Sequence, residues 1–216
     1  MAEIKFCGMT RVEDAREAAT LGAHYVGVIF AGGPRALTQR AAKEVLNGVP
    51  DDVARVGVFG AAAAEEIASH AQSLGLDVVQ LHADPDTEFI AGLRRVWHGR
   101  IWAVERVSGS VLGTKIGALF DAADAVVLDA RVDGKLGGTG VALPWSDLRD
   151  AVHPYRGRRA RLVLAGGLRP DNVAAAIDAL QPDVVDVSSG VEARVGVKDH
   201  ARMRAFRDAV HSLQPR

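Results

Sequence analysis

The chain contains the stretch LVLAGGLRPDNVAAAIDALQPDVVDVSSG at residues 162–190. Two short apolar runs, 162–165 and 184–187, lie near its two ends. Because these runs are mostly continuous rather than alternating with polar residues, they are typical of strands buried on both faces. Each run is followed at once by small residues, Gly-Gly after the first and Ser-Ser-Gly after the second.

The segment between the two runs carries the pattern of a helix. Val173, Ile177 and Leu180 recur at i, i+4 and i+7, which places them on one helical face. Pro170 and the aspartate after it are expected to open this helix, and Pro182 is expected to stop it. The stretch is therefore a strand–helix–strand unit of the kind that builds parallel sheets.

The same alternation continues outward to both ends of the chain. We expect strands at residues 4–7, 25–30, 55–59, 78–81, 101–104, 125–128, 162–165 and 184–187. Ala-rich segments lie between them, including a helix that Thr38 is expected to cap and that stops near Gly48. Eight such units without a break in composition predict an α/β fold, a single-domain (β/α)₈ TIM barrel over residues 1–216. An open doubly wound sheet is the alternative.

The composition excludes several classes of protein. The hydrophobic fraction is 48% and the charged fraction 25%, a balance that argues against disorder. The net charge of −1 gives no field to attract a polyanion, and the arginines at 156–159 have no interleaved aromatics, so we expect no nucleic-acid partner. A single cysteine excludes an intramolecular disulfide. With no signal-peptide pattern and no long apolar run, we expect a cytoplasmic protein without membrane association.

The glycine-rich turns after the last two strands predict a phosphate site. Gly166 and Gly167 follow one strand, and Ser188, Ser189 and Gly190 follow the next. Glycines let backbone N–H groups approach an anion, and the loops after strands seven and eight commonly bind phosphate in such barrels. The simpler interpretation is that each Gly only permits its turn. The sequence has no Walker A or dinucleotide-binding motif, so we expect no nucleotide cofactor.

Two residues at strand ends are candidates for acid–base chemistry. Cys7 ends the first strand, and it is either a small buried hydrophobe or a base, which needs a pKa lowered by its surroundings. Asp129 follows a wholly apolar strand, and it is either a capping or ion-pairing residue or a general acid. In a barrel, both side chains lie at the catalytic face.

Other polar residues at strand ends allow more than one interpretation. Arg35 could pair bidentately with a carboxylate, although taken alone it is more simply a surface arginine. Gln80 and His82 end the fourth strand, where a lone histidine is usually structural. Of the histidines, His82 alone falls at a strand end, so we expect no metal site.

Taken together, these residues resemble the phosphoribosylanthranilate isomerase family of tryptophan biosynthesis. The matching motifs occur in order along nearly the whole chain: IKFCGMT (4–10), RVGVF (55–59), VQLH (79–82), LD (128–129), GGTG (137–140), AGGL (165–168), VDVSSGVE (185–192) and GVKD (196–199). The Cys-Gly start and the Ser-Ser-Gly-Val-Glu run are the most specific of them.

The resemblance implies a cofactor-free Amadori rearrangement in a (β/α)₈ barrel, on a small phosphorylated substrate. N-(5′-phosphoribosyl)anthranilate would become 1-(2-carboxyphenylamino)-1-deoxyribulose 5-phosphate, with Asp129 as general acid and Cys7 as general base. Arg35 would hold the anthranilate carboxylate, and the turns after strands seven and eight would hold the phosphate. The loop with Gly137 and Gly138 would act as a lid.

The site residues that the resemblance implies are thus Cys7 and Asp129 for catalysis, and Arg35, His82, Gly137, Gly138, Gly166, Gly167, Ser188, Ser189 and Gly190 for substrate binding. The chain departs from the family pattern at four places. Ala142-Leu143-Pro144-Trp145 replaces the usual Phe-Asp-Trp, Ala83 replaces a glycine, and a serine is missing before Pro34. The fifth strand also ends differently, in Val104-Glu105-Arg106.

Two other functions remain open from the sequence. One is a different phosphosugar barrel, such as a pentose-phosphate epimerase or the histidine-pathway isomerase, although the first predicts a metal cluster and the second an aspartate in place of Cys7. The other is a barrel that binds a phosphorylated ligand without turnover. The sequence favours neither a monomer nor a homodimer.

Overall fold

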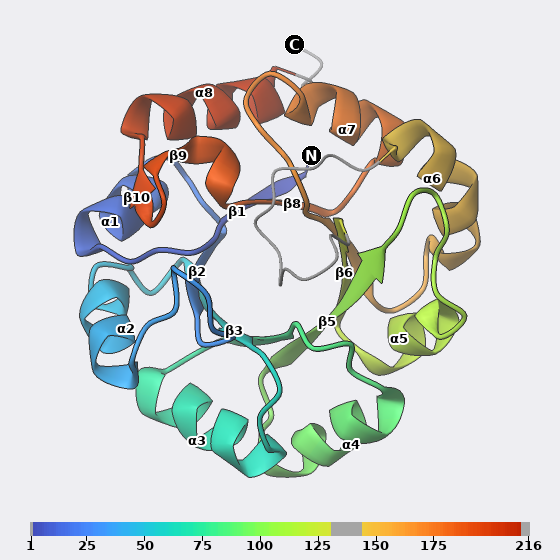
Figure 1. The fold of residues 1–216 in the computed structure, drawn as a ribbon, viewed down its shortest axis with the longest axis horizontal. Helices are drawn as coiled ribbons and strands as arrows, with labels where there is room; N and C mark the ends of the chain where they lie inside the picture. The colour runs from blue at the N-terminus through green and yellow to red at the C-terminus, as the bar shows by residue number, and fades with distance from the viewer. Residues whose placement is uncertain (1, 131–143, 213–216) are drawn as a thin grey trace.

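A computed structural model describes residues 2–130 and 144–212. Eight parallel strands close into a barrel in the order of the chain, and β8 pairs with β1. Figure 1 shows the ring of strands surrounded by the helices. The predicted (β/α)₈ barrel is confirmed, and pairing of the last strand with the first excludes the open doubly wound sheet.

Each strand is followed by a helix, as the sequence pattern requires. The barrel strands are β1 (Glu3–Phe6), β2 (Tyr25–Ile29), β3 (Ala54–Phe59), β4 (Val78–Leu81), β5 (Arg100–Val107), β6 (Ala125–Ala130), β7 (Arg161–Leu164) and β8 (Val184–Val187). The helices are α1 (Val12–Thr20), α2 (Gln39–Leu46), α3 (Ala64–Leu74), α4 (Thr87–Val96), α5 (Ile116–Ala122), α6 (Trp145–Val152), α7 (Val173–Leu180) and α8 (His200–His211). Two 3₁₀ turns, η1 (His153–Tyr155) and η2 (Ser189–Val191), and a hairpin of β9 (Glu192–Arg194) with β10 (Val197–Lys198) complete the described elements.

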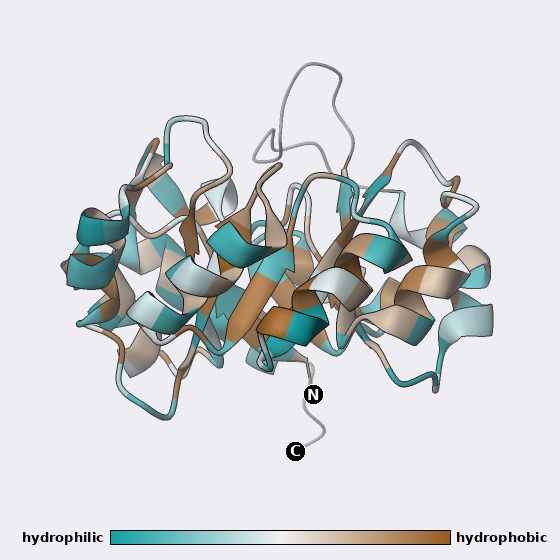
Figure 2. Ribbon diagram, turned by 90° about the horizontal axis from the view of Figure 1, so that it is seen from below, coloured by the Kyte–Doolittle hydropathy of each residue, from teal (hydrophilic) through white to brown (hydrophobic). Residues whose placement is uncertain are grey.

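Side chains on the strands alternate between two apolar cores. The larger core lies between the barrel and its helices, and the smaller one fills the barrel interior around Tyr25, Trp102 and Val127. The strands are therefore buried on both faces, which explains why their sequences are continuous apolar runs. Figure 2 shows hydrophobic residues on the strands and hydrophilic ones frequent on the outer helices.

Several predicted boundaries move by a few residues. β6 continues to Ala130, so Asp129 lies within the strand rather than after it. Thr38 caps α2 as predicted, by accepting a hydrogen bond from the Ala41 N–H at 3.3 Å. α7 begins at Val173, not at Pro170, because Asn172 keeps a non-helical backbone while its side-chain amide donates to the Gly167 carbonyl at 3.0 Å.

Two observations concern the surface of the described residues. No helix in residues 2–130 and 144–212 has the length and apolar character needed to cross a bilayer. Two of the arginines at 156–159 lie beside carboxylates. Arg158 binds Asp121 at 2.8 Å, and Arg159 lies 3.6 Å from Asp124.

Candidate functional site

The predicted site residues come together in one cleft at the carboxyl ends of the strands. Its lining includes Cys7, Arg35, His82, Asp129, Gly166, Gly167, Ser188, Ser189 and Gly190, together with Gln80 and Asp186. The cleft lies where a barrel presents its βα loops. Gly137 and Gly138, the predicted lid residues, lie outside the described residues.

Asp129 has the properties of a general acid. It projects inward from β6 and is 7% exposed. Burial, and after it the nearby charge of Asp186, raise the pKa of its carboxyl from 3.8 to about 6, although a backbone hydrogen bond from Ala130 and the charge of Lys5 act in the opposite direction. At pH 6 about half of the Asp129 carboxyls therefore carry a proton, as a proton donor requires.

His82 faces Asp129 across the cleft as a neutral imidazole. Its Nε2 lies 3.8 Å from Asp129 Oδ2, too far for a hydrogen bond. Burial and the charges of Lys5 and Arg106 lower the pKa of His82. Both of its ring nitrogens, and Oε1 of Gln80, are buried without a hydrogen-bond partner among the described residues. These polar atoms are available to a ligand in the cleft.

Cys7 is a buried thiol with a raised pKa. Burial raises its pKa above the usual 9.0, although the charges of Lys5 and Lys198 act to lower it. The lowered pKa that a cysteine base needs is therefore absent from the free site, because desolvation outweighs the attraction of the two ammonium groups. The cationic surroundings on which a thiolate depends are nevertheless in place.

A buried ion pair lies beneath Cys7 that the sequence analysis missed. Lys5 Nζ contacts Asp186 Oδ2 at 2.6 Å, and the Lys5 side chain is fully buried. These two residues are neighbours in the register of β1 and β8. A sequence signal was available, because each lies two positions before a candidate residue, Cys7 or Ser188, and period two puts them on the same inward face.

Arg35 is held by a carboxylate of the protein itself. Its Nε and NH2 groups donate to the two carboxylate oxygens of Glu192, both at 2.7 Å. The bidentate pairing that its sequence position allowed is therefore present, with Glu192 as the partner. Glu192 also accepts from Lys198 Nζ at 3.1 Å. Neither Glu192 nor Lys198 was among the predicted site residues.

The two glycine-rich turns meet at the same end of the cleft. Gly166 has φ +80°, and a Cβ there would lie 2.7 Å from the Ala130 nitrogen, so a side chain is excluded on two grounds. A Cβ on Gly190 would lie 1.9 Å from the Leu168 carbonyl oxygen, which shows how closely the two turns approach. The Ser188 hydroxyl is buried here without a partner among the described residues.

The donor set of the cleft suits acid–base chemistry on an anionic ligand. Within the described residues, no three His, Cys, Asp or Glu side chains are grouped as metal ligands are. The site offers instead a carboxyl with a pKa of about 6, a thiol beside two ammonium groups, and a guanidinium at its edge. This combination can donate one proton and remove another from the same bound molecule.

Comparisons with known proteins place these observations in a family. Residues 4–209 match the family model described as N-(5′-phosphoribosyl)anthranilate (PRA) isomerase. A relative of that name from Pseudomonas aeruginosa is 42% identical over 211 residues, which cover 97% of this chain and 95% of the relative.

Solved structures agree with the sequence match. Phosphoribosyl anthranilate isomerase from Thermotoga maritima is similar with a TM-score of 0.85 and 33% identity, and the match covers 99% of this chain and all of the other. A phosphoribosyl anthranilate isomerase in complex with reduced 1-(o-carboxyphenylamino)-1-deoxyribulose 5-phosphate gives a TM-score of 0.81 at 32% identity, with coverage of 99% and 100%.

Proposed function

Because this chain belongs to the N-(5′-phosphoribosyl)anthranilate isomerase family, we propose that Asp129 and Cys7 are the acid and base of its Amadori rearrangement. The reaction is a step of tryptophan biosynthesis and converts an aminoaldose into an aminoketose. One observation carries the assignment: a carboxyl with a pKa of about 6 and a thiol beside two ammonium groups line the same cleft.

The first step opens the ribose ring with Asp129 as proton donor. The carboxyl gives its proton to the ring oxygen, the bond from that oxygen to C1′ breaks, and the nitrogen lone pair forms a C1′=N⁺ double bond. The pKa of about 6 matches this role, because an ordinary aspartate holds almost no proton at neutral pH. The product of the step is a protonated, open-chain Schiff base.

The second step removes the proton from C2′ with Cys7 as base. The electron pair of the C2′–H bond moves to the C1′–C2′ bond, the iminium nitrogen is neutralised, and an enolamine results. The positive Schiff base favours the thiolate by Coulomb attraction, in the same direction as Lys5 and Lys198. The thiol proton passes to the carboxylate that Asp129 became on ring opening, and the thiolate then takes the C2′ proton, so both side chains end in their starting protonation states. Ketonisation then adds a proton at C1′ and releases one from O2′, so no proton is gained or lost overall.

The anionic ends of the substrate fit opposite parts of the cleft. The turns around Gly166 and Ser188 present backbone and hydroxyl donors to the 5′-phosphate. Arg35 binds the anthranilate carboxylate through guanidinium N–H groups that Glu192 does not occupy. His82, neutral at physiological pH because its pKa is lowered, supplies a polar wall beside the reacting carbons.

The decisive experiment follows the decay of anthranilate fluorescence with freshly formed phosphoribosylanthranilate, in the presence of a chelator. Wild-type protein is compared with Cys7→Ser and Asp129→Asn. We expect kcat to fall by roughly 100- to 10,000-fold in each variant, which is the range that general acid–base groups contribute. Circular dichroism and thermal melting check that both variants fold.

Near-normal kcat in a folded variant would remove that residue from its assigned role. If the wild-type protein is inert toward phosphoribosylanthranilate but binds its phosphorylated product analogue, the phosphate-binding barrel without turnover becomes the better interpretation.

A further inference from the structure

Arg35, which lines the cleft, belongs to a buried three-residue charge network with Glu192 and Lys198, and the acid–base steps assign no role to the Arg35–Glu192 pair. Arg35 and Glu192 form a two-bond pair, and their side chains are only 12% and 5% exposed. Lys198 Nζ is fully buried, donates to Glu192 at 3.1 Å and donates to the Ser188 carbonyl at 3.0 Å. Two cations thus share one carboxylate, and the network carries a net charge of +1 beside the cleft.

The geometry leaves Arg35 with free donors on a fixed plane. An arginine has five N–H groups, and Glu192 takes one from Nε and one from NH2. Three N–H groups therefore have no share in that pair. Because the guanidinium is planar and held at two points, its orientation is fixed before any ligand arrives. Arg35 also lies near Ser188 and near the residue that follows Cys7, because a Cβ on Gly8 would lie 2.8 Å from both Arg35 Cδ and Ser188 Oγ.

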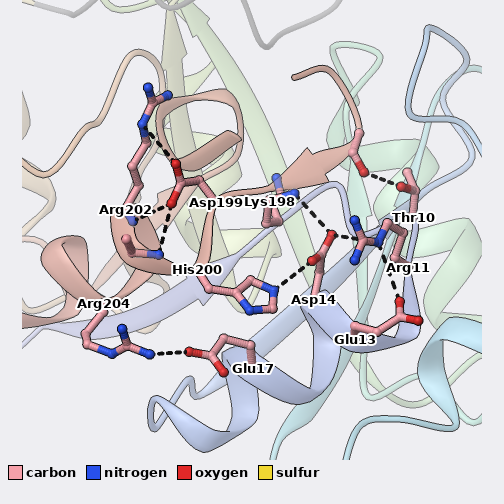
Figure 3. Close-up of polar contacts among 12 residues, drawn as sticks. Thr10, Arg11, Glu13, Asp14, Glu17, Lys198, Asp199, His200, Arg202 and Arg204 are labelled. Atoms are coloured by element: carbon pink, nitrogen blue, oxygen red, sulfur yellow. Dashed lines mark hydrogen bonds and ion pairs between the residues drawn. The ribbon is translucent and has the colours of Figure 1, made fainter. Parts of the chain in front are cut away.

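The network is itself anchored to α1 through the β9–β10 hairpin (Figure 3). Asp14, fully buried at the start of α1, accepts the Lys198 backbone N–H at 3.1 Å and contacts His200 Nε2 at 2.9 Å. The Thr10 hydroxyl donates to the Gly196 carbonyl at the tip of the same hairpin. Both strands of the hairpin carry a member of the network, Glu192 on β9 and Lys198 on β10. The hairpin is therefore held in place by contacts outside the cleft.

We infer that Glu192, braced by Lys198, is a positioning residue that orients Arg35 toward the substrate carboxylate and so sets the preference for a carboxylated aromatic amine. The inference rests on the proposed role of Arg35. A second function follows from the hydrogen bond to the Ser188 carbonyl, since Lys198 links the carboxylate end of the cleft to the turn proposed for phosphate. The parts of the cleft proposed for the two anionic ends of the substrate are thus both bonded to the same hairpin.

A purely structural role makes a different prediction. A buried ion pair contributes little net stability compared with apolar residues of the same volume, so stability alone is a weak reason for three buried charges here. If Glu192 served only the fold, its loss would affect every ligand of the cleft equally. If it orients Arg35, its loss affects only ligands that carry the carboxylate.

The experiment measures two dissociation constants by calorimetry for each variant. One ligand is reduced 1-(o-carboxyphenylamino)-1-deoxyribulose 5-phosphate, and the other is the same molecule without the ring carboxylate. The variants are Glu192→Gln, Glu192→Asp and Arg35→Gln. The matched control is Glu3→Gln, which breaks a 2.7 Å ion pair with Arg161 at the amino end of β1, away from the cleft.

We expect wild type and Glu3→Gln to bind the carboxylated ligand at least 10-fold more tightly than the other. Arg35→Gln abolishes that preference, and Glu192→Gln reduces it to less than 3-fold. Glu192→Asp keeps the charge but shortens the side chain, so it reduces the preference in a protein that retains its buried charges. In kinetics, the Glu192 variants raise KM for phosphoribosylanthranilate 10- to 100-fold and change kcat less than 5-fold.

Equal weakening of both ligands in the Glu192 variants overturns the inference and leaves Arg35 with its proposed role. If Arg35→Gln weakens both ligands by the same factor and so keeps the preference for the carboxylated one, the proposed role of Arg35 fails, and the positioning role of Glu192 fails with it.

Discussion

At the scale of single residues, burial is what separates the two catalytic candidates from ordinary side chains of their type. Asp129 and Cys7 both lie in the barrel mouth with little solvent contact, and desolvation raises the pKa of each. For a proton donor, a raised pKa is useful. For a base, a raised pKa reduces the fraction of thiolate. The positive charges of Lys5 and Lys198, and then of the Schiff base, act against that effect. The same physical effect therefore has opposite consequences for the two roles.

The raised pKa of Asp129 predicts that this residue lowers the free energy of unfolding although the proposed activity needs it. An aspartate whose pKa rises from 3.8 to about 6 on folding is penalised when it ionises, so the penalty is absent below pH 4, grows between pH 4 and 6, and is complete above pH 6. Its full size is about 3 kcal/mol, because a tenfold change in proton affinity corresponds to about 1.4 kcal/mol.

Asp129→Asn is therefore expected to stabilise the fold by about 2–3 kcal/mol at pH 8 and by less than about 0.5 kcal/mol at pH 4, while it removes activity. Urea unfolding at the two pH values measures the difference. A gain of the same size at both pH values would show that ionisation of Asp129 is not its cause.

At the scale of elements, the two turns after β7 and β8 are the most tightly constrained part of the cleft. The turn after β8 continues into η2, and Gly190 within it passes almost against the Leu168 carbonyl of the preceding loop. Asn172 fixes that loop from the other side, through its bonds to Gly167 and to the Arg169 N–H. The backbone donors proposed for phosphate are thus preorganised by contacts between elements.

Gly190→Ala is expected to disrupt this arrangement, because its Cβ would lie 1.9 Å from a backbone oxygen that cannot move alone. We expect KM for phosphoribosylanthranilate and the Ki of inorganic phosphate to rise at least 10-fold. Gly92→Ala in α4 is the control, since its Cβ meets only the flexible end of Arg95 at 3.6 Å.

The control should stabilise the fold by about 0.5–1 kcal/mol, as Gly-to-Ala changes inside helices do, and leave both constants unchanged. An unchanged Ki for phosphate in Gly190→Ala would place the phosphate elsewhere in the cleft.

At the scale of the whole molecule, a buried ion pair connects the two strands that close the barrel. Lys5 and Asp186 join the first and last strands of the ring across 181 residues of sequence. Removing one member of such a pair leaves an uncompensated buried charge, which typically costs 3–5 kcal/mol, whereas replacing both by apolar residues is often neutral.

Lys5→Met is therefore expected to lower the free energy of unfolding by about 3 kcal/mol, and Lys5→Met with Asp186→Leu to recover most of that loss. Denaturant titration of the single and double variants at pH 7.5 measures both effects. The double variant should still lose activity, because the charge that lowers the pKa of Cys7 is gone. A double variant less stable than the single one would contradict this account of the closure.

Local sequence was sufficient to predict the architecture and the end of the barrel at which the candidate residues line one cleft. Continuous apolar runs marked the strands, and the position of Cys7, Asp129 and Ser188 after or near strand ends placed them at one mouth, because all strands of a barrel run the same way. Boundaries were less certain, since Asn172 delays the start of α7 through side-chain bonds that a helical period does not reveal.

What only the tertiary structure decided is which charges meet. The pairing of Arg35 with Glu192 joins residues 157 positions apart, and the pairing of Lys5 with Asp186 joins the two ends of the barrel. The pKa of Asp129 depends on the same distances and on burial, neither of which is a property of its neighbours in sequence. Periodicity is local and survives in the sequence, whereas Coulomb energies and desolvation depend on three-dimensional proximity that exists only once the barrel has closed.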